Sequence, residues 1–194
     1  MITVLRRLLS ASRVSHRGRY YQFEDVTIDP RPPQFPKLWI AGGSKIKTSL
    51  SPDPERMAPS VLRRIAQADG WTARAAGEQE MVKEDWRQIT AYCESVGRDP
   101  STLTFSHLNF VHLVATDSRE AAHRVQRPYF ENVMGMHRTW EHLQRSYFTG
   151  TTDDIVSRIK DLEASGLQHM VLCPLDYDLE QLEMYASMIL PHFQ

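Results

Sequence analysis

The sequence predicts an α/β fold with about four parallel strands and helices outside them, preceded by a helix and a short β-hairpin. Two observations lead to this prediction. Short apolar runs rich in branched and aromatic residues, typical of buried strands, alternate four times with helical stretches. Such alternation indicates right-handed βαβ units, which place parallel strands side by side. At 194 residues, 41% of them hydrophobic, the chain is expected to form a single domain over residues 1–194.

The first part of the chain is predicted to lie outside the sheet. Residues 2–10 form an amphipathic helix by their apolar spacing. Tyr21, Phe23 and residues 26–28 suggest a hairpin or a pair of extended strands. The proline-rich residues 29–36 must be an irregular connector, because proline removes a backbone donor and cannot join a central strand.

The repeating part of the chain supplies the predicted sheet. Its strands are expected at residues 38–41, 69–73, 103–115 and 170–173. Helices are expected at residues 59–67, 79–96, 117–148 with breaks near Pro128 and Gly135, 152–166 with an N-cap signature at 151–154, and 179–190. The last of these is predicted to pack four side chains inward, those of Leu182, Tyr185, Ala186 and Ile189.

Composition excludes several kinds of partner. A net charge of -1 gives no basic excess for nucleic acid or an anionic membrane surface, and no apolar stretch is long enough to cross a bilayer. Arginines cluster near the start, but no long apolar segment or cleavage site accompanies them. Cys93 and Cys173 are far apart and are expected to be two buried free thiols. A cytoplasmic location is therefore predicted.

The first predicted strand stops at two glycines and a hydroxyl, Gly42, Gly43 and Ser44. Glycines let the backbone turn tightly with its N–H groups exposed, and a serine hydroxyl adds a further donor. This arrangement suits a phosphate group. The same tripeptide is common in ordinary turns, so the phosphate site and the plain turn are both hypotheses here.

The eight histidines do not predict a metal site. His107 and His112 are five residues apart in a predicted strand and so point to opposite faces, while His137 and His142 share a helical face poorly. Nor does the chain contain a nucleophile elbow or a Walker-type loop, which leaves hydrolase and nucleotide-triphosphatase functions unsupported.

Several weak motifs, in order along nearly the whole chain, resemble the luciferase-like monooxygenase family. They are His16-Arg17-Gly18-Arg19-Tyr20-Tyr21-Gln22-Phe23, Leu38-Trp39-Ile40-Ala41-Gly42-Gly43-Ser44, Ala68-Asp69-Gly70-Trp71, Val96-Gly97-Arg98-Asp99-Pro100, Gly150-Thr151 and Ala164-Ser165-Gly166-Leu167-Gln168-His169-Met170-Val171-Leu172. The resemblance implies the C-terminal half of a (β/α)8 TIM-type barrel, containing strands five to eight.

The resemblance also implies a cofactor and a site. Members of the family use reduced FMN or the deazaflavin coenzyme F-420 (F420) for oxygen insertion or hydride transfer on small organic substrates. By similarity, Gly42, Gly43 and Ser44 would hold the phosphate end of the cofactor after the fifth strand. Trp71 would lie at the end of the sixth strand and face the cofactor cavity. The carboxyl ends of barrel strands are where such sites lie.

Two features depart from the family pattern. The chain lacks the first half of the barrel, which supplies much of the substrate pocket, and residues 45–57 form a long loop that contains Lys45 and Lys47. These lysines are predicted either to clamp an anion or, as is usual for charged residues in polar loops, to be solvated. The expected function is therefore a truncated flavin-dependent oxidoreductase or monooxygenase that needs its first half for turnover. The alternative is a non-catalytic half barrel that pairs with a second copy as a homodimer, because unpaired sheet edges must be covered.

Overall fold

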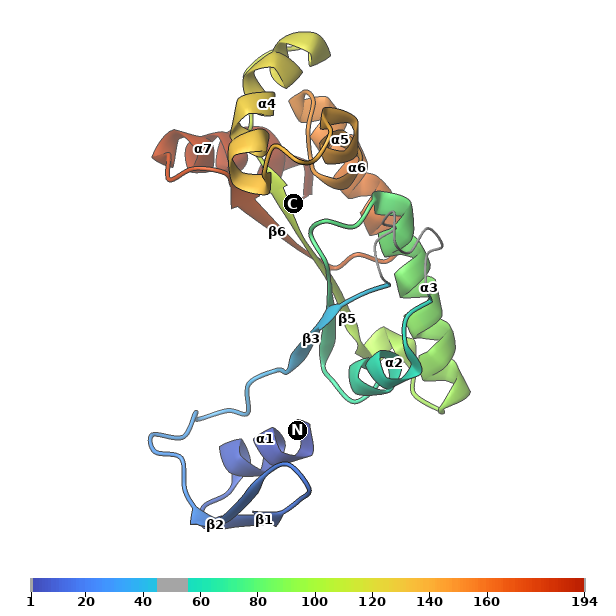
Figure 1. The fold of residues 1–194 in the computed structure, drawn as a ribbon, viewed down its shortest axis with the longest axis vertical. Coiled ribbons are helices and arrows are strands. Elements are labelled where there is room, and N and C mark those ends of the chain that lie inside the picture. The colour runs from blue at the N-terminus through green and yellow to red at the C-terminus, as the bar shows by residue number, and fades with distance from the viewer. Residues whose placement is uncertain (1, 45–55, 194) are drawn as a thin grey trace.

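A four-stranded parallel sheet organises the chain, as Figure 1 shows. The computed structural model describes residues 2–44 and 56–193. The strands lie in the order β3 (Trp39–Gly42), β4 (Gly70–Ala73), β5 (Thr104–Val111) and β6 (His169–Pro174), each parallel to the next. The predicted α/β class and the strand order along the chain are confirmed.

The helices that follow these strands lie mostly along one face of the sheet (Figure 1). They are α2 (Pro59–Ile65), α3 (Gln79–Ser95), α4 (Arg119–Met134), α5 (Trp140–Ser146), α6 (Thr152–Ala164) and α7 (Leu179–Met184), with 3-10 turns at Pro100–Thr102 and Leu190–Phe193 and a π turn at Tyr185–Ile189. Among the described residues, no helix is long and apolar enough to span a bilayer.

The main core fills the space between the sheet and these helices. Alternate residues of β5 turn toward the helices, and Phe105 and Val111 are fully buried there. Trp71 on β4 stacks on Phe105, and both rings stack on Trp86 of α3, with centroids 4.8 to 6.1 Å apart. Aromatic rings of this size dominate the apolar area that a domain buries, so this stack seats α3 on the sheet.

Asp69 ties the starts of three strands together. Its backbone N–H donates to the Leu38 carbonyl and its own carbonyl accepts from Thr104, while its carboxylate accepts from the Leu38 N–H at 2.8 Å. The same carboxylate forms an ion pair with Arg6 of α1 (Ile2–Ser10). The aspartate in the Ala68-Asp69-Gly70-Trp71 motif is therefore a structural anchor at the amino ends of the strands.

A second, smaller apolar cluster lies beyond the carboxyl ends of the strands. Phe130 of α4, Leu143 of α5 and Tyr147 are buried in it, and Phe110 near the end of β5 and Leu175 just after β6 pack against it. In Figure 1, α4 and α5 accordingly sit above the ends of β5 and β6. These two helices cap the edge of the sheet where barrel enzymes place their sites.

The N-terminal helix α1 and a hairpin lie below the sheet (Figure 1). The hairpin pairs β1 (Val14–Arg17) with β2 (Gln22–Val26). The predicted hairpin after the first helix is confirmed. Tyr21, Phe23 and residues 26–28 indicated only the region of β2, and the position of β1 was not predicted. Val14 is the one aliphatic residue in β1, so hydrophobic alternation gave no signal there.

Two helix predictions were also wrong in detail. Pro128 does not break α4, because the turns on both sides are held: Gln126 bonds the His112 and Gly150 carbonyls, and Phe130 is buried.

In α7 and its π turn, Tyr185 and Ile189 pack inward as predicted. Two of the four residues do not: Leu182 is 50% exposed and Ala186 also faces solvent.

Gln181 takes the inward position one turn before Tyr185. Its amide accepts from the Leu113 N–H at 2.7 Å and donates to the Leu113 carbonyl at 3.1 Å, so it pairs the backbone just beyond β5. This contact explains why β5 ends at Val111 rather than at residue 115, because the chain leaves the ladder and bonds a side chain instead.

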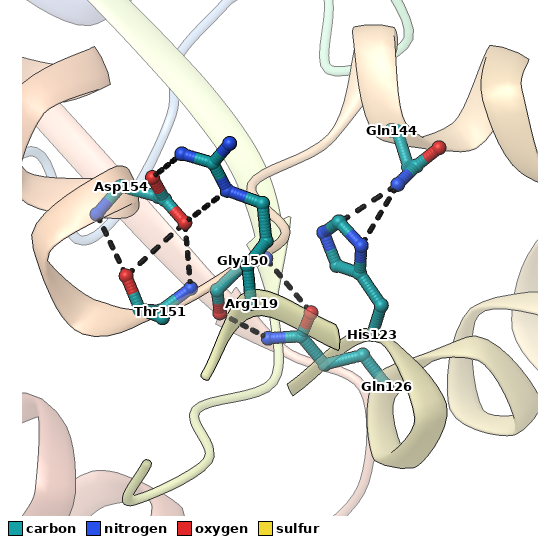
Figure 2. A network of polar contacts seen from close by, with 7 residues as sticks. All are labelled: Arg119, His123, Gln126, Gln144, Gly150, Thr151 and Asp154. Atoms are coloured by element: carbon teal, nitrogen blue, oxygen red, sulfur yellow. Dashed lines mark hydrogen bonds and ion pairs between the residues drawn. The ribbon is translucent and has the colours of Figure 1, made fainter. Parts of the chain in front are cut away.

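A polar network joins α4 to the start of α6 (Figure 2). The Arg119 guanidinium pairs with the Asp154 carboxylate, which also accepts from the Thr151 N–H as half of a capping box. Gln126 bonds both the N–H and the carbonyl of Gly150. The hydrogen bond from Arg119, opposed by partial burial, lowers the pKa of the Asp154 carboxyl below its usual range. The predicted N-cap signature at residues 151–154 is confirmed.

We expect Asp154→Ala to destabilise the protein by about 1–2 kcal/mol, because it removes the Asp154 half of the capping box and an ion pair together. The neighbouring Asp153 is exposed, so Asp153→Ala is the matched control, with little expected loss. Urea unfolding of both variants checks this prediction. Equal losses in the two variants would contradict the assigned network.

Stability should fall as the pH is lowered from about 6.5 to about 4. His107 on β5 is 2% exposed, and burial, together with the nearby Arg158 charge, lowers its pKa from 6.5 to about 4. The unfolded chain therefore takes up a proton at a pH where the folded chain does not, which removes on the order of 3 kcal/mol across this range.

The variant His107→Gln should lose this part of the pH dependence. Urea unfolding at pH 7 and pH 5 measures it. An unchanged difference between the two pH values in the variant would show that another group is responsible.

Candidate functional site

The candidate site lies at the carboxyl ends of β3 and β4. Gly42 ends β3 and is followed directly by Gly43 and Ser44, while Arg74 follows the last residue of β4. In a parallel sheet these two ends meet at one edge, the edge where barrel enzymes bind ligands. Residues 42–44 are called the Gly-Gly-Ser loop below.

Gly42 has a backbone conformation that other residues rarely adopt. Its φ angle is +151°, within the range that favours glycine. Its carbonyl accepts a hydrogen bond from the indole N–H of Trp71 at 3.0 Å. The first glycine is therefore explained by the turn itself, and the neighbouring strand fixes that turn.

Ser44 is bonded to a carboxylate from α3. Its backbone N–H donates to Asp85 Oδ2 at 2.9 Å, and its hydroxyl donates to Asp85 Oδ1. Ser44 is 5% exposed and Asp85 is 4% exposed, so the contact is buried. Both donors that the phosphate hypothesis assigns to Ser44 are thus engaged by an anion of the chain itself.

Gly43 is needed for the approach of that carboxylate. A Cβ atom at Gly43 would lie 2.5 Å from Asp85 Oδ2, closer than real Cβ contacts allow. The Gly43 carbonyl accepts from Arg74 Nη2 at 3.2 Å. The absence of a side chain at Gly43 therefore leaves room for Asp85, whose carboxylate fills the space where a Cβ atom would lie.

The surroundings of Asp85 shift the pKa of its carboxyl in both directions. Burial raises the pKa of its carboxyl, and the charge of neighbouring Glu84 adds to this. The two hydrogen bonds from Ser44 and the positive charge of Arg74 oppose the rise. A buried carboxylate is costly unless other groups support its charge; here two hydrogen bonds from Ser44 and the nearby charge of Arg74 do so.

Helix α3 bonds the described residues on both sides of residues 45–55. Asp85 binds Ser44 before them, and three residues later the Gln88 side chain accepts from the Met57 N–H at 3.1 Å. Lys45 and Lys47, predicted either to clamp an anion or to be solvated, lie outside the described residues.

Trp71 does not occupy the predicted position. Its ring is fully buried among Trp86, Phe105 and the rest of the main core, on the helix side of the sheet. The expectation that it faces a cofactor cavity is therefore wrong. In β4, the side chain of every second residue points to the helices, and Trp71 is such a residue.

Gly42, Gly43 and Ser44 lie at the carboxyl end of β3, where Asp85 and Arg74, which were not predicted, join them. One signal for Asp85 was present. The inward stripe of α3 consists of Val82, Asp85, Ile89 and Cys93, so a charged residue stands at an apolar position of the helix. As these residues stand, they do not fit a phosphate at Ser44, because its donors face Asp85.

Metal-binding residues do not converge elsewhere in residues 2–44 and 56–193: no three histidine, cysteine, aspartate or glutamate side chains gather there as ligands. Cys93 is buried in α3 and Cys173 is half-buried in β6, and both thiols are free as predicted.

A double-mutant cycle tests the fit between Gly43 and Asp85. We expect Gly43→Ala to cost about 1–3 kcal/mol, because the added methyl group overlaps the carboxylate. In an Asp85→Ala background the same change should cost less, since the overlap is gone. Urea unfolding of the four proteins measures the difference. Additive losses would show that the two residues do not compete for the same space.

Comparison with known proteins finds likeness of fold. An F420-dependent secondary alcohol dehydrogenase in complex with an F420-acetone adduct matches 100% of this chain with a TM-score of 0.74 and 14% identity. A monooxygenase from Streptomyces bottropensis also matches 100% of the chain, with a TM-score of 0.71 and 18% identity. A riboflavin lyase with modified FMN matches 92% of it, with a TM-score of 0.59 and 13% identity.

This chain spans 60% of the length of the first two structures and 47% of the third. No family model and no curated protein sequence matches the chain. The identities are low, so these likenesses concern the fold. The four parallel strands and their helices are a partial TIM-type barrel, and the predicted resemblance to the luciferase-like monooxygenases is confirmed at the level of the fold.

Proposed function

We propose that this chain is the cofactor-binding part of a flavin-type oxidoreductase or monooxygenase, and that turnover needs further barrel strands. The observation that carries the proposal is the match of the whole chain to an F420-dependent secondary alcohol dehydrogenase. Enzymes of barrel fold bind their ligands at the carboxyl ends of the strands. In this chain the carboxyl ends of β3 and β4 hold the Gly-Gly-Ser loop and Arg74. Helices α4 and α5 lie over the carboxyl ends of β5 and β6.

The proposed ligands are FMN or F420 and a small organic substrate. When bound, such a cofactor supplies hydride transfer or oxygen chemistry, and the protein supplies binding, orientation and exclusion of water. Arg74 brings a positive charge to the loop, which favours the anionic end of either cofactor. We propose that this phosphate end approaches the Gly-Gly-Ser loop, whose Ser44 donors become available only when Asp85 moves away.

Fluorescence titration of the purified chain with FMN, F420 and riboflavin tests this function. Saturable binding of FMN or F420 is expected, with riboflavin weaker than FMN because riboflavin lacks the phosphate. Inorganic phosphate should compete with FMN and not with riboflavin. If neither FMN nor F420 binds, the proposed function is wrong.

A second candidate function is a non-catalytic half barrel that pairs with another copy. The observation in its favour is the sheet face that points away from the main core. Leu108, Val171 and Cys173 lie on that face and are only half-buried. Apolar sheet faces are normally covered. Light scattering on the purified chain decides between the two states: twice the mass of one chain supports pairing, and a monomer alone removes it.

A further inference from the structure

Ser44 and Asp85 form a contact with the chemistry of a phosphate site. Carboxylate and phosphate oxygens both accept hydrogen bonds from backbone N–H and hydroxyl donors, and charged acceptors form the stronger bonds. Here one carboxylate uses both oxygens, one on the Ser44 N–H and one on its hydroxyl. The positive charge of Arg74 acts on the same carboxylate. An anion of suitable shape already occupies these donors.

We propose that Asp85 is a built-in competitor for the Gly-Gly-Ser loop, which holds Ser44 in place of an external phosphate group and sets how tightly that group binds. The inference rests on the proposed function for its biological ligand, although the contact itself does not. Asp85 is then a positioning residue: it fixes the loop when no ligand is bound, and it must leave Ser44 before a phosphate reaches the same donors.

The geometry of the second glycine supports this assignment. The Cβ position of Gly43 is taken up by Asp85 Oδ2, and the first glycine is explained by its φ angle. Gly43 and Ser44 therefore both have a role in receiving the carboxylate, and Gly42 forms the turn before them. A phosphate and Asp85 cannot bind the Ser44 N–H at once, since that donor has one hydrogen and Oδ2 accepts it.

The test follows the Ser44 amide by NMR while inorganic phosphate is added to the whole chain. Four proteins are compared: the natural chain, Asp85→Ala, Asp85→Asn and Glu84→Gln. Glu84 is the neighbouring carboxylate on α3 and pairs with Arg87, so its variant removes the same charge without touching the loop. Asp85→Asn keeps the size and one acceptor oxygen of the side chain but loses its charge.

The expected result is a graded gain in phosphate affinity. The apparent dissociation constant at the Ser44 amide should fall at least about tenfold in Asp85→Ala, because both donors become free. Asp85→Asn should lie between that variant and the natural chain, and Glu84→Gln should match the natural chain. Tight phosphate binding at Ser44 in the natural chain, or an equal gain in Glu84→Gln, would overturn the proposal.

Folding of the variants is checked by the dispersion of the same spectra. If neither Asp85 variant folds, the contact between Asp85 and Ser44 is required for folding. Asp85 could then not leave Ser44 to make room for a ligand. That outcome also overturns the proposal.

Cofactor titration of the same proteins separates this inference from the proposed function. Binding of FMN or F420 that is stronger in Asp85→Ala than in the natural chain supports both. Equal binding by the two proteins retains the proposed function and rejects the competitor. If no protein binds either cofactor but phosphate reaches Ser44 only in the Asp85 variants, the proposed function fails and the competitor stands.

Discussion

The stack of Trp71, Trp86 and Phe105 fixes α3 on the sheet and, through α3, the position of Asp85. It joins two neighbouring strands to α3 through three large rings that pack almost parallel. Because side chains in a core pack at high density, such a stack fixes both the position and the rotation of the helix. Asp85 precedes Trp86 in α3 and is thereby directed at the end of β3, where it meets Ser44.

The same geometry links stability to the candidate site. Trp71 belongs to the core, yet its indole N–H holds the Gly42 carbonyl and so shapes the turn into the Gly-Gly-Ser loop. Asp69 anchors the opposite end of the sheet through Leu38, Thr104 and Arg6. One end of the sheet is therefore held by Asp69, while the other end carries the buried contact between Ser44 and Asp85.

The sequence was most informative where hydrophobic periodicity is strong. The alternation of strands and helices, the strand at Trp39–Gly42 and the cap at Thr151 could all be predicted, because each depends on local pattern. The first strand of the hairpin could not, since it contains a single aliphatic residue. Gln181 and Asp85 were missed for a related reason: each is a polar residue at an inward helical position, held by a backbone group far along the chain. Long-range polar pairing leaves little trace in hydrophobic spacing.

The role of the glycines shows the limit of a short motif. Two glycines and a serine after a buried strand suit a phosphate, and they suit a buried carboxylate equally well, because both are anions that accept from the same donors. The residue that distinguishes the two cases lies 41 positions further along the chain. The position of α3 on the sheet, and not the motif, places Asp85 at the loop.

Hydrogen exchange at the Ser44 amide measures whether Asp85 occupies this donor. If the N–H is bound to a buried Asp85 carboxylate, it should exchange as slowly as amides of the main core in the natural chain, and much faster in Asp85→Ala. Exchange in the natural chain at the rate of an exposed loop would contradict the account, because Ser44 would then be open to solvent and to a ligand without any change at Asp85.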